Sequence, residues 1–568
     1  MSTTYRLRTL LLAILTSIAL LAAACGSGDD TESSTDSADS STEETAEAAS
    51  EESVDAEDDF GQADEAEEAV VDAPDAMEEE AMEDSEGAAA DSATAGANRS
   101  VAPAADGGFF AVEGPDAEED VDAQFEDYGI RSFIATDRDP LSTFALDVDT
   151  GAYSIARQWL ESGQLPPRES VRVEEYVNSF NYDYPAPSEG LTVVADGGPS
   201  PFNPDNVILR LGVQAEQVAN SERPDAALTF VIDTSGSMDR PNRLDLVKDA
   251  LVGLTRELDR SDTVAIVTYS DGGQVVLPPT SVADEDEIID AIDSLRPNGS
   301  TNLEAGLEVG YELANEQYRR DGVNRVILAS DGIANVGLTD PDGLASMIRD
   351  DADEGIHLVT VGVGMDGFND VLMEQLADQG DGFYAYVDDL SEAQRLFSDE
   401  LVSTLVTVAI DGKIQVEFNP ETVDQYRLIG FENRAVLDDD FRNDAVDAGE
   451  LGAGHQVTAI YELTLRPGVR GRDRLGTAQL RWQDPEERTA RETRLELTAN
   501  TLDDRWSSTS DDFRLAVTVA SFAEILRDSP HRGDISLSEV HAEADALAER
   551  SGQVAELTRL IDIARDLS

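Results

Sequence analysis

Residues 230–238 read Phe-Val-Ile-Asp-Thr-Ser-Gly-Ser-Met, an apolar run that ends abruptly in hydroxyls and a carboxylate. The run Ala227–Ile232 is almost continuously apolar, as expected for a strand buried on both faces of a parallel sheet. Asp233, Ser235 and Ser237 follow it as a D-x-S-x-S pattern. Because the loops at the carboxyl ends of parallel strands form the ligand crevice of an open α/β sheet, we predict a binding loop here.

Strand-like and helix-like patterns alternate on both sides of this run. Such alternation predicts right-handed crossovers and a doubly wound, mostly parallel α/β sheet. The expected strands are Val207–Val213, Ala227–Ile232, Thr263–Tyr269, Asn324–Leu328 and Ile356–Val363, and the expected helices are 243–259, 285–295, 302–318, 341–353 and 369–379.

The flanking segments have other patterns. A strand is expected around Ser142–Val148 and a helix around Tyr153–Glu161, while period-two alternation through 404–500 predicts antiparallel β structure. Ser510, Asp511 and Asp512 are suited to cap the first of three final helices. The predicted organisation is a signal peptide (1–24), a lipidated cysteine with a linker (25–127), an N-terminal segment (128–204), the α/β domain (205–402) and a β-rich and helical C-terminal domain (403–568).

Two further loops carry oxygen side chains. Thr301 lies directly before the helix expected at 302–318, and Asp331 follows the strand expected to end at Leu328. Hydroxyls and carboxylates together form a hard oxygen site of the kind that magnesium or manganese prefers. If the three loops meet at one edge of the sheet, they predict a divalent cation site.

These three motifs, in this order, resemble the metal-ion-dependent adhesion site of von Willebrand factor type A domains. The resemblance implies direct metal ligation by Ser235 and Ser237, ligation by Thr301 either directly or through water, and ligation by Asp233 and Asp331 mostly through water. It implies Mg²⁺, or Mn²⁺ or Ca²⁺, as the cation. It also implies one open coordination position for an acidic side chain of a protein ligand.

Other segments are similar to YfbK-like bacterial lipoproteins, which carry such a domain. The similarity lies in Ser142–Gly151, Val171–Glu175, Asn369–Asp378 and Asp512–Arg514, so it extends over about residues 130–568. The last of these segments belongs to a C-terminal domain of unknown function in that family.

The N-terminus predicts secretion and a lipid anchor. Arg6 and Arg8 precede an apolar run, Leu10–Leu21, that is too short to span a membrane. Small residues then lead to Cys25, the only cysteine of the chain, and the run resembles a bacterial lipobox. We therefore expect the mature protein to be diacylated at Cys25 and held at the extracytoplasmic face of the cell membrane.

Composition excludes some partners. The chain has 119 acidic and 40 basic residues, a formal net charge of −79, so no basic surface is available to neutralise nucleic acid. Residues 26–98 contain neither lysine nor arginine and very few aromatic residues, which predicts a disordered acidic spacer.

Two other functional classes compete with metal-dependent protein binding. An enzyme is not expected: Asp149-Thr150-Gly151 fits an aspartic-protease pattern but has no second copy, and Asp149 and Thr150 are better interpreted as helix caps. No nucleophile elbow surrounds Ser235, and no small-molecule substrate is expected. The main alternative is a structural or scaffold protein of the envelope, with a metal site that is vestigial or only stabilising.

Overall fold

The computed structural model describes residues 125–146, 148–332, 341–365, 368–399, 405–444, 446, 448–485 and 487–568. All of them belong to one unit, Asn98–Ser568. The predicted signal peptide, Cys25 and the predicted disordered linker up to residue 124 lie outside the described residues.

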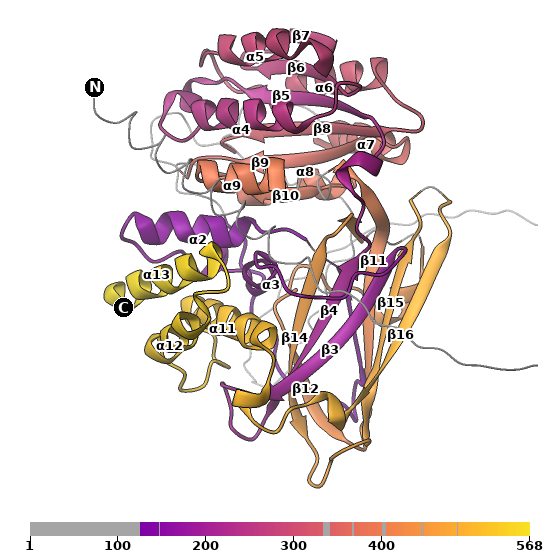
Figure 1. Cartoon of the computed structure of the whole chain (residues 1–568), viewed down its shortest axis with the longest axis vertical. Helices are drawn as coiled ribbons and strands as arrows, with labels where there is room; N and C mark the ends of the chain where they lie inside the picture. The colour runs from indigo at the N-terminus through magenta and orange to yellow at the C-terminus, as the bar shows by residue number, and fades with distance from the viewer. Residues whose placement is uncertain are drawn as a thin grey trace, which may run out of the picture. The chain divides into compact units, whose positions relative to one another are not determined.

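A six-stranded sheet contains the sequence motif from which the fold was inferred (Figure 1). Its strand order is β10-β9-β8-β5-β6-β7, and every pair is parallel except β6 with β7. The predicted doubly wound, mostly parallel sheet is therefore confirmed. Its strands are β5 (Ala226–Asp233), β6 (Thr263–Tyr269), β7 (Gly273–Ser281), β8 (Val323–Ser330), β9 (His357–Gly362) and β10 (Phe383–Tyr386).

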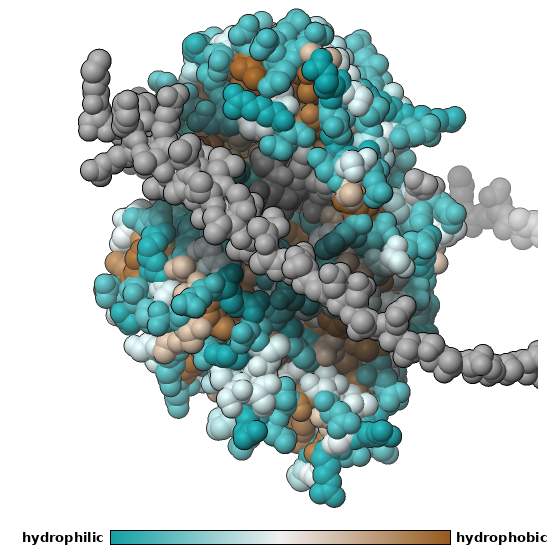
Figure 2. Space-filling model, in the orientation of Figure 1, coloured by the Kyte–Doolittle hydropathy of each residue, from teal (hydrophilic) through white to brown (hydrophobic). Residues whose placement is uncertain are grey.

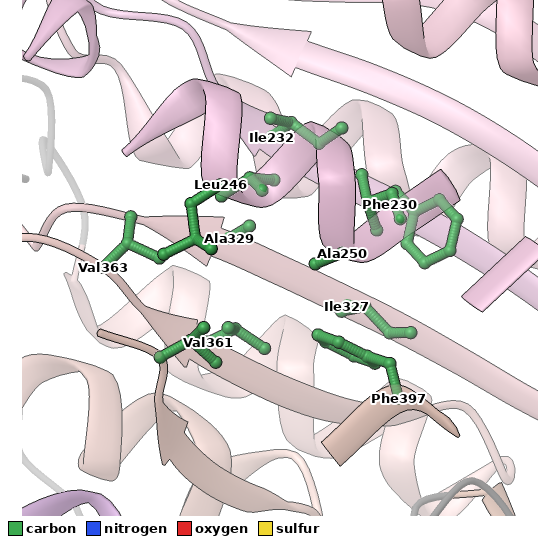
Figure 3. A pocket seen from close by; sticks show the side chains of 12 residues that line it. Phe230, Ile232, Leu246, Ala250, Ile327, Ala329, Val361, Val363 and Phe397 are labelled. Carbon is green, nitrogen blue, oxygen red and sulfur yellow. The ribbon is translucent and has the colours of Figure 1, made fainter. Parts of the chain in front are cut away.

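Helices cover both faces of this sheet, because side chains of β5 alternate between two cores. Phe230 and Ile232 pack in a cluster with residues of α4 (Leu244–Glu257), α5 (Glu285–Ser294) and α9 (Leu390–Gln394). Figure 3 shows Phe230 and Ile232 beside Leu246, Ala250 and Phe397 in this cluster. Val231 instead joins α6 (Leu303–Glu316), α7 (Pro341–Asp353) and α8 (Asp370–Gln379) on the other face.

Two antiparallel sheets form a separate β-sandwich. Their orders are β1-β12-β14-β4-β3 and β13-β11-β15-β16, with β2 added to β11, and inward-facing residues of both sheets form one core. The strands are β1 (Ile134–Ala135), β2 (Leu141–Ala145), β3 (Leu191–Pro199), β4 (Val207–Ala215), β11 (Thr407–Phe418), β12 (Val423–Ile429), β13 (Gly449–Gly452), β14 (Gln456–Leu465), β15 (Arg474–Gln483) and β16 (Ala490–Thr498).

The strand expected at Val207–Val213 forms, but its placement in the α/β sheet was wrong. As β4 it lies between β3 and β14 and is antiparallel to both. It is buried along nearly its whole length, which gives it the apolar composition of an α/β strand. Its burial comes instead from the sandwich core on one face and from helices near β14 on the other.

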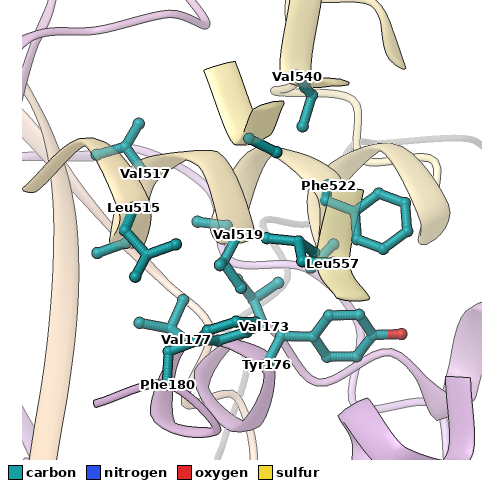
Figure 4. Packing of buried hydrophobic residues seen from close by; sticks show 14 of the residues in the cluster. Val173, Tyr176, Val177, Phe180, Leu515, Val517, Val519, Phe522, Val540 and Leu557 are labelled. Atoms are coloured by element: carbon teal, nitrogen blue, oxygen red, sulfur yellow. The ribbon is translucent and has the colours of Figure 1, made fainter. Parts of the chain in front are cut away.

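The C-terminal helices pack with helices from the N-terminal segment. The first, α11 (Asp511–Leu526), is buried around most of its circumference, and its N-cap Ser510 accepts a hydrogen bond from the Phe513 N–H at 3.0 Å, as predicted. Figure 4 shows Tyr176 and Val177 of α3 (Val173–Asn178) against Phe522 and its neighbours. The other members of this helical core are α2 (Gly151–Glu161), α12 (Leu537–Leu547) and α13 (Gly552–Leu567).

Among the described helices, none combines the length and the apolar composition needed to cross a bilayer. Hydrophilic residues cover most of the face seen in Figure 2.

Truncation of Leu557 in the helical core should destabilise the protein. Its side chain is fully buried, so Leu557→Ala is expected to lower the free energy of unfolding by about 2–5 kcal/mol. Urea denaturation followed by far-UV circular dichroism measures this change. Asp566→Ala, at an exposed position of the same helix, is the matched control and should change it by no more than about 0.5 kcal/mol. Equal effects of the two substitutions would contradict the packing described for α13.

Candidate metal centre

The first loop of the candidate site begins where the central strand ends. Asp233 is fully buried and pairs in register with Tyr269 of β6. One oxygen of its carboxylate, Oδ1, accepts the backbone N–H of Ser235 at 2.8 Å. The Ser235 and Ser237 hydroxyl oxygens are 2.9 Å apart. The D-x-S-x-S residues therefore form one hydrogen-bonded group at the carboxyl edge of the sheet.

The second loop is fastened to the first by backbone hydrogen bonds. The Gly236 N–H donates to the Gly299 carbonyl at 3.1 Å, and the Asn298 N–H donates to the Thr234 carbonyl at 2.6 Å. Asn302 caps α6 by accepting from the Ala305 N–H at 3.1 Å. Thr301, which is buried, lies between these fastened positions.

The third loop is joined to Asp233 by a side chain. The Ser330 hydroxyl donates to Asp233 Oδ2 at 3.1 Å and accepts the Gly332 N–H at 3.1 Å. Asp331 is fully buried next to this serine. A guanidinium nitrogen of Arg243, which is also buried, donates to Asp331 Oδ2. The structure thus places all five predicted site residues on three neighbouring loops at one sheet edge.

Burial and neighbouring charge set the electrostatics of the site, in which the buried Asp331 is paired with Arg243. Burial, and secondly the charge of Asp331, raise the pKa of the Asp233 carboxyl to about 6, although hydrogen bonds from Ser235 and Ser330 favour its charged form. Burial and the Asp233 charge also raise the pKa of Tyr269 well above its usual value. A buried carboxylate whose charged form is disfavoured in this way favours the binding of a cation.

The available donors suit a hard divalent ion. Two carboxylates and the hydroxyls of two serines and one threonine match the oxygen ligands of Mg²⁺ or Mn²⁺. In the part of the chain that the structure describes, no group of three or more His, Cys, Asp and Glu residues could hold a metal. A metal at this edge would therefore depend on the hydroxyls, and ligation by these five residues stays a prediction.

Arg243 is the residue of this site that sequence reasoning missed. It directly precedes α4, where an arginine is unfavourable because the helix N-terminus carries partial positive charge. This unfavourable placement was the available signal in the sequence, since a nearby carboxylate would offset it.

Asp149 and Thr150, expected to cap α2, have other roles. The Thr150 side chain makes no capping hydrogen bond. The Ala152 N–H donates instead to Glu175 Oε2 at 2.7 Å. The Asp149 carboxylate accepts from the Tyr384 N–H at 2.9 Å and from Arg434 at 2.8 Å. The capping prediction was wrong for Thr150, because Glu175, a charged residue from another helix, accepts the Ala152 N–H of the first turn instead.

Comparison with known proteins agrees with this architecture. The family model of the von Willebrand factor type A (VWA) domain matches residues 227–399, the model "Uncharacterized protein YfbK, C-terminal" matches 403–567, and a model described as von Willebrand factor matches 119–210. The uncharacterized protein YfbK of Escherichia coli is 36% identical over 469 residues, covering 78% of this chain and 80% of YfbK. This chain belongs to the YfbK family.

More distant relatives match smaller parts of the chain. An uncharacterized Synechocystis protein is 26% identical over 49% of this YfbK-family chain and 66% of its own length. Inter-alpha-trypsin inhibitor heavy chain H3 of Pongo abelii is 26% identical over 42% of this chain, which spans only 29% of that relative. Among solved structures, a von Willebrand factor type A protein from Catenulispora acidiphila gives a TM-score of 0.41 at 17% identity, over 67% of this chain and 91% of that one.

The raised pKa of Asp233 predicts a pH-dependent effect of Asp233→Asn when a chelator is present. The carboxyl ionises near 3.8 when unfolded and near 6 when folded, so the folded state binds more protons between these values and loses stability as the pH rises through them. Asparagine does not ionise, so the Asp233→Asn variant does not lose stability as the pH rises. The variant should match wild type near pH 4 and exceed it above pH 6 by on the order of 3 kcal/mol, measured by urea denaturation. A difference that does not vary with pH would contradict this account.

Proposed function

We propose that this protein captures a protein ligand through a divalent cation bound at the carboxyl edge of its VWA sheet. The observation that supports the proposal is the convergence of three loops, which brings the buried Asp233 carboxylate next to serine hydroxyls, with Thr301 and Asp331 buried on the adjoining loops. Such a site would offer oxygen ligands to a cation, and Ser237 is its most accessible residue, being half-buried.

Each residue has a distinct part in the proposed site. The Ser235, Ser237 and Thr301 hydroxyls would hold the ion, and the Asp233 and Asp331 carboxylates would neutralise its charge. Once bound, a divalent cation would supply a positive centre for an acidic side chain of the ligand. Hydrogen bonds from Ser235 and Ser330 hold Asp233 in orientation before any ligand arrives.

We further propose that the protein acts at the outer face of a bacterial membrane, through acyl chains on Cys25. The acidic spacer would then give the VWA domain reach, because about a hundred residues of flexible chain average roughly 55 Å from end to end. A net charge of −79 also favours a protein ligand over nucleic acid.

We propose a binding protein and not an enzyme. Asp149, the one residue in a protease-like pattern, is held by Arg434 and by the Tyr384 N–H. An aspartate engaged in this way is a poor catalytic acid or base, which supports a structural role.

One observation favours the scaffold alternative. Arg243 already neutralises Asp331. This is expected of a site in which an arginine of the protein takes the place of a metal ion. A scaffold of this kind would hold its partner equally well with magnesium and with EDTA, whereas metal-dependent capture would be lost in EDTA.

Removal of a hydroxyl ligand tests metal-dependent capture. Ser235→Ala is expected to weaken Mn²⁺ binding by the purified full chain about tenfold or more, measured by isothermal titration calorimetry. The same substitution should abolish magnesium-dependent capture of protein from envelope extract, with the far-UV spectrum unchanged. Ser294→Ala, at an exposed serine that ends α5, is the matched control. Capture by Ser235→Ala at wild-type strength would refute the adhesion mechanism.

The lipid anchor has a separate test. Cys25→Ser removes the thiol that would be acylated, so the variant is expected to leave the membrane fraction and appear in the soluble fraction. Immunoblots of fractionated cells measure this distribution. A variant that stays with the membrane rules out anchoring through Cys25.

A further inference from the structure

Arg243 places a guanidinium against two of the proposed metal-binding residues. Its side chain is 1% exposed, and one nitrogen, Nη1, donates both to Asp331 Oδ2 and to the Ser237 carbonyl, the latter at 3.3 Å. Two of the five proposed metal-binding residues thus share one permanent positive charge.

The position of Arg243 is fixed by the surrounding backbone. Its carbonyl accepts the Val247 N–H at 2.9 Å as α4 begins, and the preceding Asn242 has a positive φ of 57°. A Cβ on Gly364 would lie 2.4 Å from Arg243 Nε, so the loop after β9 needs glycine to admit the guanidinium. Loops after three different strands therefore enclose this side chain.

Orientation of Asp331 does not depend on Arg243 alone. The loop that carries Asp331 is held independently by Ser330, which bonds both Asp233 and the Gly332 N–H. The charge of Arg243 is therefore its distinctive contribution to the site.

We infer that Arg243 is a built-in cation that competes with the divalent metal for Asp331. This inference rests on the proposed metal site and adds the residue that sets its affinity. At hydrogen-bond distance from shared ligands, repulsion between a guanidinium and a dication outweighs any gain from a better oriented carboxylate. Binding of the metal is consequently weaker than five oxygen ligands alone would give, and the fold tolerates loss of the metal because Asp331 keeps a positive partner.

The test compares Mn²⁺ binding by full-chain variants, with calorimetry as the readout. Arg243→Gln and Arg243→Met, which keep much of the side-chain length without charge, are expected to bind Mn²⁺ about tenfold more tightly than wild type. Arg243→Lys keeps the charge and should stay close to wild type. Affinity that is unchanged or weaker in both uncharged variants overturns the inference.

Stability in EDTA supplies a second readout that needs no ligand. Arg243→Gln should lower the melting temperature, and the effect should shrink when Asp331→Asn is already present, because the pair interacts directly. If Arg243→Gln does not fold in EDTA, addition of Mn²⁺ is expected to restore the native far-UV spectrum. Failure of that rescue would also overturn the inference.

The outcomes separate this inference from the proposed function. Mn²⁺ binding by wild type with no gain in the uncharged variants contradicts the role of Arg243 and leaves metal-dependent capture standing. Mn²⁺ binding only after loss of Arg243 supports the inference and contradicts metal-dependent capture by the natural protein. If neither wild type nor the uncharged variants bind Mn²⁺, both the inference about Arg243 and metal-dependent capture are overturned.

Discussion

Complete burial of the central strand is the constraint on which the candidate site depends. Because β5 is covered by helices on both faces and by parallel strands on both edges, Asp233 at its end has no access to water. The carboxylate must find its compensation in neighbouring loops. Hydrogen bonds from Ser235 and Ser330 supply it, and they join the loops that follow β5 and β8 at this edge of the sheet.

The VWA domain is inserted into a second structural body that neither flank forms alone. Strand β2 from before the domain pairs with β11 from after it, and β4 pairs with β14 in the other sheet. The helical core is shared in the same way, since α3 packs against α11. The N-terminal and C-terminal flanks therefore depend on each other for burial of their apolar faces.

Buried ion pairs connect this shared body to the VWA domain. Arg157 of α2 pairs with Asp388, and Arg172 next to α3 pairs with Asp370 of α8. Arg434, after β12, bonds Asp149 and also Glu374 of α8. Removing Arg157 would take from the buried Asp388 its guanidinium partner, so these contacts restrict how the two bodies meet. Asn242, beside Arg243, also donates to the Asp388 carbonyl at 3.4 Å, which brings this connection to the edge of the candidate site.

Local pattern by itself predicted the four inner strands of the α/β sheet, most of its helices and the loops that carry the candidate ligands, but not the edge strands β7 and β10. Continuous apolar character marked β5, and the helix expected at 302–318 is observed as Leu303–Glu316 with Asn302 as its cap. Such features are readable because periodicity and capping involve residues close in sequence.

Only the tertiary structure decided which sheet β4 joins, what holds Asp149 and which cation neighbours Asp331. Burial gives a strand the same apolar composition in a sandwich as in an α/β sheet, so composition alone did not assign Val207–Ala215. The partners of Asp149 and Asp331 are arginines 285 and 88 residues away along the chain. Charges compensate each other according to their separation in space. The sequence alone does not say which residues, far apart along the chain, lie close together in the fold.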